Sequence, residues 1–208
     1  ATFSAASLDG PGTRTVTARV TDAGGLTATD SATISIRNVP PTATFHAPGS
    51  VAAGFGFMLS LTDPSDPSAA DTAAGFSFAF DCGTGFGTFG SSSSISCLTT
   101  DAGDRLVAAK IKDKDGGISE YRASVHVVVT FDSLCALTRS YARNPSVADA
   151  LCAKLDAAGT APNDNARDGV LNAFRNQVDG QTGTEPGKSF VLDQAAILNR
   201  LSLRLQGL

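Results

Sequence analysis

The sequence Gly12-Thr13-Arg14-Thr15-Val16-Thr17-Ala18-Arg19-Val20-Thr21-Asp22 returns later in the chain as Gly103-Asp104-Arg105-Leu106-Val107-Ala108-Ala109-Lys110-Ile111-Lys112-Asp113. A Gly-Gly pair follows each copy, Gly24-Gly25 in the first and Gly116-Gly117 in the second, and then comes a second alternating run. Apolar and polar residues alternate along these runs, as they do on a strand that buries one face. Each copy is therefore predicted to be the terminal β-hairpin of a sandwich of about 90 residues.

The two copies place apolar residues at corresponding positions. In the first copy these are Val16, Ala18, Val20, Ile34 and Ile36, and in the second they are Val107, Ala109, Ile111, Val125 and Val127. Because side chains alternate across a strand, each set is predicted to share one face of its hairpin.

Composition changes near residue 130. Residues 1–130 are rich in Ser, Thr, Gly and Val in short alternating runs separated by turn residues, which is typical of an all-β sandwich. In residues 131–208, Ala, Leu, Asp, Asn and Arg recur at helical spacing. We therefore predict immunoglobulin-like β-sandwich repeats followed by a small all-α helical bundle. The predicted domains are 1–37, 38–130 and 131–208.

Residues 1–37 contain only the last two strands of a repeat, and a two-stranded hairpin alone is marginally stable in water. Three explanations follow: the chain is cut from a longer protein, the hairpin docks on the next domain, or another chain supplies the missing strands. We favour the first, because exposed strand edges otherwise invite aggregation. The linker Asn38-Val39-Pro40-Pro41 is expected to be short and fairly stiff because of its paired prolines.

Charge excludes some classes of partner. Lys plus Arg number 16 against 20 Asp plus Glu, and the net charge of −4 gives no electrostatic reason to expect nucleic acid or an anionic membrane surface. No run approaches about 18 consecutive apolar residues, so no membrane span is predicted. The chain begins at Ala1 and shows no basic segment followed by an apolar one. We expect a processed or excised soluble fragment.

Two motifs in the middle stretch resemble a known repeat. Phe80-Asp81-Cys82-Gly83-Thr84-Gly85 stands where the polycystic-kidney-disease (PKD) type of immunoglobulin-like repeat has Trp-Asp-Phe-Gly-Asp-Gly, and Asp113-Lys114-Asp115-Gly116-Gly117 resembles its Asp-rich turn before the last strand. Phe80, Cys82 and Thr84 depart from the motif, so the chain resembles a divergent member. The resemblance covers 38–130 well and 1–37 in part. Such repeats are common in bacterial surface proteins and secreted hydrolases, and the resemblance implies an extracellular spacer or adhesion role.

Four cysteines, Cys82, Cys97, Cys135 and Cys152, fall two in the β region and two in the helical region. Helices before and after Asn144-Pro145 would form a hairpin that puts Cys135 and Cys152 at ~12 to 14 Å from the turn, within disulfide reach if their faces match. We predict Cys82–Cys97 and Cys135–Cys152 disulfides, each worth roughly 3 kcal/mol in the chain-entropy model. Disulfides imply an oxidising compartment, outside the cell or at its surface. A four-thiolate metal site is disfavoured because no CxxC pair is present.

The C-terminal region is predicted to hold four helices. Ser133 caps the first, and Asn144 caps the second, with Pro145 at its first position and Gly159 after its end. Apolar residues recur at helical spacing as Leu134, Leu137 and Tyr141; Val147, Leu151 and Leu155; Leu171, Phe174 and Val178; and Leu198, Leu201 and Leu205. One apolar face per helix predicts a small bundle.

Several stretches of this region also resemble a named domain. They are Leu151, Lys154-Leu155-Asp156-Ala157-Ala158, Leu171-Asn172-Ala173-Phe174, Val178 and Gly187-Lys188. In these stretches the sequence resembles FIMAH, a small C-terminal helical domain of bacterial secreted enzymes and adhesins, over most of 133–205. The matching residues are core and loop residues, so the resemblance implies a fold and carries no functional site.

Acidic residues in the middle domain suggest a metal site. Asp63, Asp66 and Asp71 occupy the loop after the second strand, and Asp113 and Asp115 occupy the loop before the last. In an immunoglobulin-like topology these loops share one end of the sandwich, so the five carboxylates are predicted to converge beside the linker. Oxygen ligands on flexible loops suit Ca²⁺, which would neutralise repulsion and stiffen the joint. The alternative is that Asp simply favours solvated turns.

No catalytic site is predicted, since His46 precedes a turn and His126 lies on an alternating strand. The phenylalanines alternate as core residues do, and the absence of Trp disfavours sugar stacking. We predict a non-catalytic extracellular structural or adhesion module of a larger secreted or surface protein. The alternative is an ancillary region of a secreted hydrolase that binds polysaccharide or protein substrate. Expected partners are other repeats of the parent protein, extracellular matrix or cell-surface protein, polysaccharide, and a second copy through the incomplete first repeat.

Overall fold

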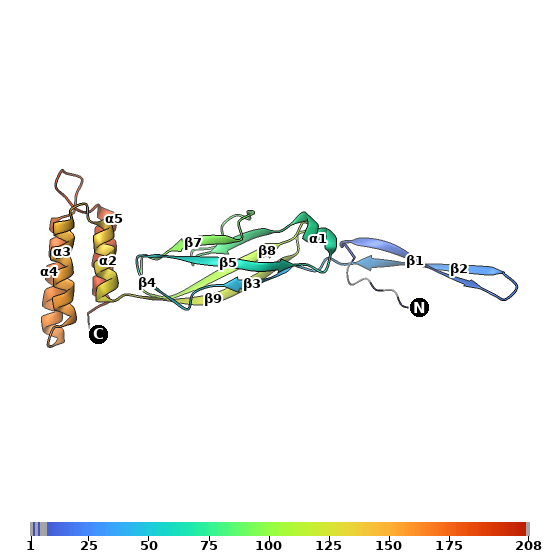
Figure 1. The fold of residues 1–208 in the computed structure, drawn as a ribbon, viewed down its shortest axis with the longest axis horizontal. Helices are drawn as coiled ribbons and strands as arrows, with labels where there is room; N and C mark the ends of the chain where they lie inside the picture. The colour runs from blue at the N-terminus through green and yellow to red at the C-terminus, as the bar shows by residue number, and fades with distance from the viewer. Residues whose placement is uncertain (1, 3, 5–7, 207–208) are drawn as a thin grey trace. The chain divides into compact units, whose positions relative to one another are not determined.

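The computed structural model describes residues 2, 4 and 8–206. Its first elements, β1 (Gly12–Thr21) and β2 (Thr27–Ile36), pair antiparallel as a two-stranded sheet (Figure 1). Val16 lies opposite Ala32, and Thr17 lies opposite Ser31. The hairpin predicted for the first copy is therefore confirmed.

Strands β3–β9 form two further sheets. The first has the order β3 (Thr42–His46), β5 (Gly56–Ser65), β7 (Ser94–Leu98), and the second has the order β4 (Ser50–Ala52), β9 (Ile118–Val128), β8 (Gly103–Lys112), β6 (Ser77–Asp81). β3 and β5 pair antiparallel, as do β6 and β8, whereas β4 runs parallel to β9. The second copy of the repeated sequence thus forms the hairpin β8–β9. A short helix, α1 (Ala69–Ala74), follows β5 where the sequence predicts only a loop.

Both of these sheets bury one face and expose the other. On β5, Leu59 and Leu61 are 0% and 1% exposed, whereas Met58 is 60% exposed. On β8, Ile111 is fully buried and Leu106 is 57% exposed. A sheet with one apolar face needs a second layer to cover it, so the strand order and this alternation indicate a β-sandwich.

The C-terminal region folds into α2 (Phe131–Tyr141), α3 (Pro145–Gly159), α4 (Asp164–Gly180) and α5 (Leu192–Leu203). α2 packs on α3 and α5, and α4 packs on the same two helices (Figure 1). Their shared core includes the fully buried Leu151, Leu155, Leu171, Phe174, Leu198 and Leu201. The helical spacing in the sequence predicted that these residues form the apolar faces of the helices.

Helix caps differ in detail from the prediction. Thr130, and not Ser133, is the N-cap of α2: its hydroxyl accepts a hydrogen bond from the Ser133 N–H at 3.0 Å, and the Ser133 hydroxyl accepts one from the Thr130 N–H at 2.9 Å. This reciprocal capping box starts the helix earlier. Asn144 caps α3 with Pro145 at its first position, as predicted, but α3 runs through Gly159 and does not stop before it.

The structure contains two disulfides. Cys135 Sγ and Cys152 Sγ are 2.00 Å apart, with the Cα atoms 5.0 Å apart across α2 and α3. Cys82 and Cys97 are also disulfide-bonded, and the chain has no free cysteine. The second disulfide therefore joins Cys82 to Cys97, and both predicted pairings are confirmed.

The chain divides into two compact units, which are described separately below. The first unit comprises Ala1–His46, Leu59–Ile95 and Ala108–Arg122, and the second comprises Ala47–Met58, Ser96–Val107 and Ala123–Leu208. The first contains the hairpin β1–β2 and the turn after β8, and the second contains α2–α5. The predicted domain limits stay predictions. Within the part of the chain that the structure describes, no helix is both long and apolar enough to cross a bilayer.

Candidate functional site

The turn between β8 and β9 is organised by the carboxylate of Asp113, which is 4% exposed. Its Oδ1 accepts hydrogen bonds from the backbone N–H groups of Asp115 at 2.9 Å and Gly117 at 2.8 Å. Its Oδ2 accepts one from Asn38 Nδ2 at 2.8 Å. One side chain therefore closes the turn and ties the linker to it.

The linker passes so close to this turn that Gly117 must lack a side chain. A Cβ added there would lie 2.4 Å from Asp113 Oδ2, 2.7 Å from Asn38 Nδ2 and 3.0 Å from Pro40 Cα. Those distances are shorter than van der Waals contact, and one of them is to backbone. The glycine is thus a requirement of the joint between linker and turn.

The hairpin β1–β2 has the same turn without the joint. Asp22 Oδ1 accepts hydrogen bonds from the N–H groups of Gly24 at 2.9 Å and Leu26 at 2.8 Å, and Gly25 has φ +87°. Gly116, with φ +89°, is therefore the counterpart of Gly25. The two Gly-Gly pairs are therefore offset by one residue between the turns. Leu26 occupies the position that glycine holds beside the linker.

Three carboxylates gather next to the second turn. Ligand oxygens of Asp9, Asp71 and Asp115 lie within 4.8 Å of one another. Lys114 Nζ is 2.9 Å and 3.1 Å from the two oxygens of Asp9, is 3.3 Å from Asp71 Oδ1, and also pairs with Asp115. Asp71, on α1, is completely buried. We call these four residues the joint cluster.

Contacts within the joint cluster shift the pKa values of Lys114 and Asp9. Hydrogen bonds to Asp115 and then Asp9 raise the pKa of Lys114 above its ordinary value. The hydrogen bond from Lys114 lowers the pKa of Asp9. One ammonium group thus lies beside three carboxyl groups. The chain's own lysine acts as the cation that holds the carboxylates together.

Two of the residues predicted to bind calcium lie in the joint cluster. They are Asp71 and Asp115, and Asp9 joins them. Sequence reasoning missed Asp9 because it precedes the repeated stretch, where no alternation or repeat assigns it a place. Only folding brings it to α1, where its carboxylate also accepts a hydrogen bond from the Ser68 hydroxyl at 3.1 Å.

The other predicted ligands lie elsewhere. Asp113 uses both oxygens in the turn and linker contacts. Asp66 Oδ1 accepts a hydrogen bond from the Ser68 N–H at 2.7 Å, just before α1. Asp63 is exposed with φ +52°, and it accepts a hydrogen bond from the Thr62 hydroxyl at 3.0 Å. Among the described residues, these three carboxylates do not belong to the group whose oxygens lie close enough together to hold a metal ion.

The joint cluster offers only carboxylate oxygens as ligands, which is the chemistry that Ca²⁺ prefers. However, Lys114 Nζ already contacts all three carboxylates. A metal ion at their centre would require that ammonium to leave. Calcium binding by this chain stays a prediction.

The two histidines each have a polar neighbour at the surface. His126 Nδ1 lies 2.6 Å from Asp104 Oδ1, and His46 Nε2 lies 2.9 Å from Thr62 Oγ1. Both rings are exposed, and His126 projects from the outer face of β9 as its strand position predicts. Exposed pairs of this kind stay in water, which weakens the electrostatic stabilisation that catalysis uses.

Two phenylalanine rings beyond β6 are covered by lysines of β8. Lys110 Nζ lies 3.9 Å from the centre of the Phe86 ring, and Lys112 Nζ lies 4.3 Å from the centre of the Phe89 ring. These cation–π contacts hold the loop on the outer face of the sheet. A ring capped by an ammonium group does not present that face to a sugar.

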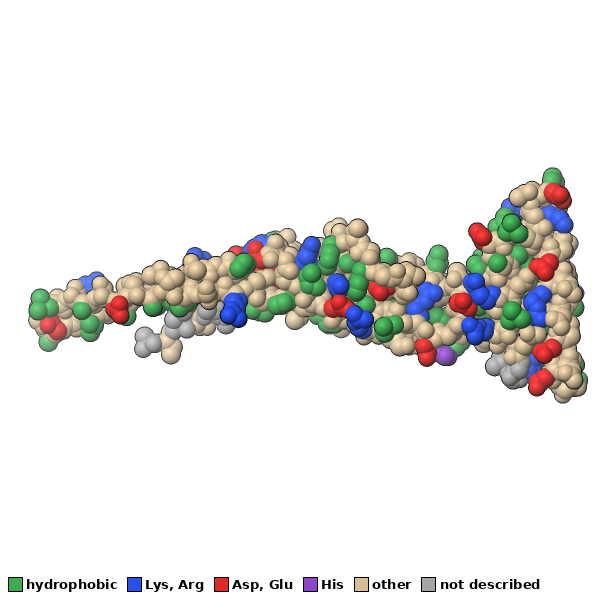
Figure 2. All heavy atoms as spheres, turned by 180° about the vertical axis from the view of Figure 1, so that it is seen from behind, with side chains coloured by type: hydrophobic (Ala, Val, Ile, Leu, Met, Phe, Trp, Pro, Cys, Tyr) green, Lys and Arg blue, Asp and Glu red, His purple; other side chains and the backbone are tan. Residues whose placement is uncertain are grey.

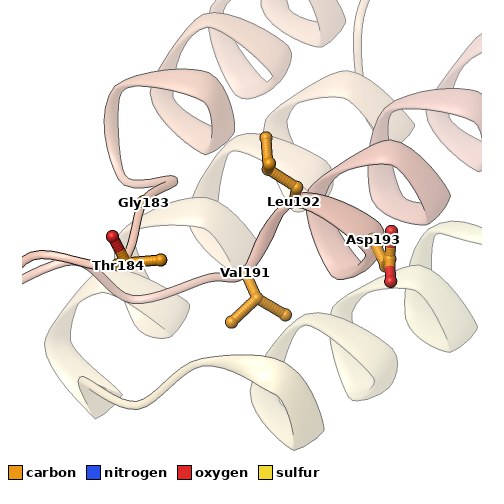
Figure 3. Close-up of a pocket in the computed structure, with 5 residues that line it drawn as sticks. All are labelled: Gly183, Thr184, Val191, Leu192 and Asp193. Carbon is orange, nitrogen blue, oxygen red and sulfur yellow. The ribbon is translucent and has the colours of Figure 1, made fainter.

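The helical region contains a shallow pocket of about 430 Å³. It is lined by Gly183, Thr184, Val191, Leu192 and Asp193, where the loop after α4 runs into α5 (Figure 3). Leu192 is 76% exposed. The lining is mostly apolar and offers one carboxylate, so it lacks the paired groups of an acid–base site.

No family model matches this sequence, and no curated protein matches it. Solved structures give partial likenesses. Carbohydrate-binding modules from the β-sandwich superfamily, described for their promiscuous specificity, align at 18% identity with a TM-score of 0.39, over 45% of this chain and 36% of theirs. The PKD1 domain of Vibrio anguillarum Epp aligns at 22% identity with a TM-score of 0.33, over 45% of this chain and 99% of that domain.

Fibronectin(III)-like modules of Clostridium thermocellum CbhA align at 13% identity with a TM-score of 0.37, over 58% of this chain and 65% of theirs. PKD domains, fibronectin(III)-like modules and carbohydrate-binding modules are thus among the structures with partial likeness. At these values the likeness assigns no family, and the fold rests on the strand order and burial given above. The FIMAH resemblance stays a prediction.

Proposed function

We propose that this chain is a non-catalytic extracellular module that spaces or anchors other parts of a larger secreted or surface protein. Its joints are stiff because distant segments lock each joint with hydrogen bonds, ion pairs and close backbone contacts. The observation that carries this proposal is the joint around Asp113, where linker and turn meet at Gly117 without room for a side chain.

The joint cluster adds a second set of contacts to the same joint. Lys114 links Asp9, which precedes β1, to the buried Asp71 of α1. A buried carboxylate is costly without a partner, so this pairing favours one arrangement of the segments over others. Stiff joints transmit position along a chain, which is what a spacer requires.

The second unit contains a joint of its own. Ala53 and Val127, from the strand region, belong to the same core as α2–α5. A Cβ added at Gly54 would lie 2.3 Å from Leu137 Cδ2, and Arg200 Nη2 donates to the Thr100 carbonyl at 2.8 Å. Strands and helices therefore pack directly on each other within this unit.

Two disulfides support placement outside the cytosol, because reducing conditions would not maintain them. The ancillary substrate-binding alternative requires an exposed binding platform. The lysine-covered rings of Phe86 and Phe89 do not favour it.

Nuclear magnetic relaxation of backbone amides tests the stiffness of the first joint. We expect amides of β1–β2 and of the β8–β9 turn to report one common tumbling time. In Asn38→Ala combined with Lys114→Met, the two sets are expected to tumble separately. Independent tumbling in the unaltered chain would contradict the spacer proposal.

Calcium can be tested at the same joint. If Lys114 is the resident cation, millimolar Ca²⁺ gives no heat in titration calorimetry with the unaltered chain. Lys114→Met leaves three uncompensated carboxylates, so its melting temperature is expected to fall and then to rise with added Ca²⁺. Heat and stabilisation in the unaltered chain would instead favour calcium as the natural occupant.

A further inference from the structure

The apolar face of hairpin β1–β2 lacks a complete cover. Val20 is 66% exposed, Ala18 and Ala32 are exposed, and Val16 and Ile34 are only half-buried. Figure 2 shows hydrophobic side chains at the surface of this hairpin, at the left of the view. Two charged residues, Arg14 and Asp30, lie on the same face, opposite Ile34 and Ala18, and they separate the apolar pairs Val16–Ala32 and Val20–Ala28. Exposed apolar surface on a strand pair marks a place where another segment packs.

The opposite face of the hairpin is polar. Apart from Arg19 it consists of Thr13, Thr15, Thr17, Thr21, Thr27, Thr29, Ser31, Thr33 and Ser35. Hydroxyls pair across the strands, with Thr17 Oγ1 2.8 Å from Ser31 Oγ. A strand pair with one hydroxyl-rich face and one apolar face has the pattern of an outer sandwich layer whose apolar side is meant to be covered.

The matching hairpin β8–β9 shows what that cover is. Val107, Ile111 and Val125, at the equivalent inward positions, are all 0% exposed. The facing sheet β3-β5-β7 contributes Leu59 and Leu61 to the buried interior. The same sequence pattern is therefore buried when a three-stranded sheet lies over it.

The edges of the two hairpins differ in the same way. β8 pairs with β6 and β9 pairs with β4, so neither outer edge of β8–β9 is free. Among the described residues β1 and β2 pair only with each other, over strands of 10 residues each. Such long free edges are templates for added strands.

An arginine of β8 also contacts the sheet that covers the second hairpin. Arg105 Nη1 donates a hydrogen bond to the backbone carbonyl of Leu98 on β7 at 2.8 Å. Arg14 holds the equivalent position in the first copy and is exposed. Its guanidinium is available for the same bond to a covering strand.

We infer that β1–β2 is the acceptor half of a second sandwich, and that its occupant is a polypeptide segment with strands equivalent to β3–β7. Two of those strands pair with the free edges, as β4 and β6 do, and three cover the apolar face. This inference goes beyond the spacer proposal, which depends on the joint and not on what fills the hairpin.

A second copy of the hairpin is a poorer occupant. Two strands of 10 residues present a face of roughly 33 Å by 10 Å. Two such faces together would bury roughly 700 Å², short of the ~1,200 Å² typical of stable interfaces. They would also leave all four strand edges unpaired. The multi-strand segment satisfies both the face and the edges.

The test joins a copy of residues 38–102, which carries β3–β7, ahead of the intact 208-residue chain. Hydrogen exchange of the β1 and β2 amides is measured in the extended and unextended proteins. We expect those amides to exchange at least about tenfold more slowly in the extended protein, because the added strands convert exposed edges into a protected ladder. Equal exchange rates would overturn the inference.

Two neighbouring substitutions in the extended protein separate face-specific docking from general stabilisation. Val16→Asp, on the apolar face, is expected to abolish the added protection, whereas Thr17→Asp, on the polar face, leaves it in place. Loss of protection in both variants, or in neither, contradicts docking on the apolar face. Sedimentation of the unextended chain completes the test: a concentration-dependent dimer that Val16→Asp abolishes would make a second copy the occupant.

Discussion

Hairpins β1–β2 and β8–β9 share a sequence pattern and an Asp-closed turn, yet one exposes its apolar face and the other buries it. At equivalent positions Val20 is 66% exposed and Ile111 is 0% exposed. Both copies therefore form a hairpin with an Asp-closed turn, whether or not the apolar face is covered. Burial, and with it most of the hydrophobic stabilisation, depends on a facing sheet that lies elsewhere in the chain.

Aspartate substitutions at the equivalent positions Val20 and Ile111 are expected to differ most in their effect on the free energy of unfolding. Ile111→Asp places an unpaired charge in a fully buried site and is expected to cost more than ~4 kcal/mol, enough to unfold the sandwich. Val20→Asp is expected to change stability by less than about 0.5 kcal/mol. Urea unfolding followed by circular dichroism measures both. Similar losses in the two variants would show that the first hairpin is already covered.

The disulfide between Cys82, which follows β6, and Cys97 on β7 gives the next largest expected effect. Replacing both Cys82 and Cys97 by alanine opens a loop of about 15 residues and is expected to cost roughly 3 kcal/mol. Amides of β8–β9 should then exchange faster, while those of β1–β2 stay unchanged. The matched control replaces Cys135 and Cys152, which should loosen α2 and α3 instead. Faster amide exchange in both hairpins would show that the stability of β1–β2 also depends on the Cys82–Cys97 disulfide.

A reciprocal exchange between the turns tests the joint. Gly117→Leu drives a side chain into Asp113 and the Pro40 backbone, and is expected to cost about 1–3 kcal/mol. Leu26→Gly, at the equivalent but exposed position, is expected to cost less than about 1 kcal/mol. Thermal unfolding of the two variants compares them. Equal effects would mean that the linker does not pack on the turn in solution.

Lowering the pH is expected to have the smallest effect on the stability of the joint. Because Lys114 lowers the pKa of Asp9, this carboxylate stabilises the folded joint above its ordinary pKa, and the contribution is lost as the pH falls through the lowered value, below about pH 4. Amide chemical shifts near Lys114 and α1 should report the change. Asp9→Asn removes that part of the titration. An acid transition that persists in Asp9→Asn would assign it to other carboxylates.

Part of the candidate site followed from sequence and part did not. The motif Asp113-Lys114-Asp115-Gly116-Gly117 predicts an acidic turn, and the turn is there. The hydrogen bond between this turn and the linker depends on Asn38, and the joint cluster also requires Asp9 and Asp71. These partners are distant in sequence and carry no shared periodicity, so only the folded chain identifies them.

The sequence alone determined the hairpins, the four C-terminal helices and the cysteine pairs, because strand alternation, helical spacing and turn residues act over a few neighbouring positions. It did not indicate α1. The tertiary structure decided which apolar face is covered and which carboxylates meet a lysine. Those outcomes depend on segments that are far apart along the chain. Val20 and Ile111 obey the same local rule, and only the presence of a facing sheet makes one of them a core residue.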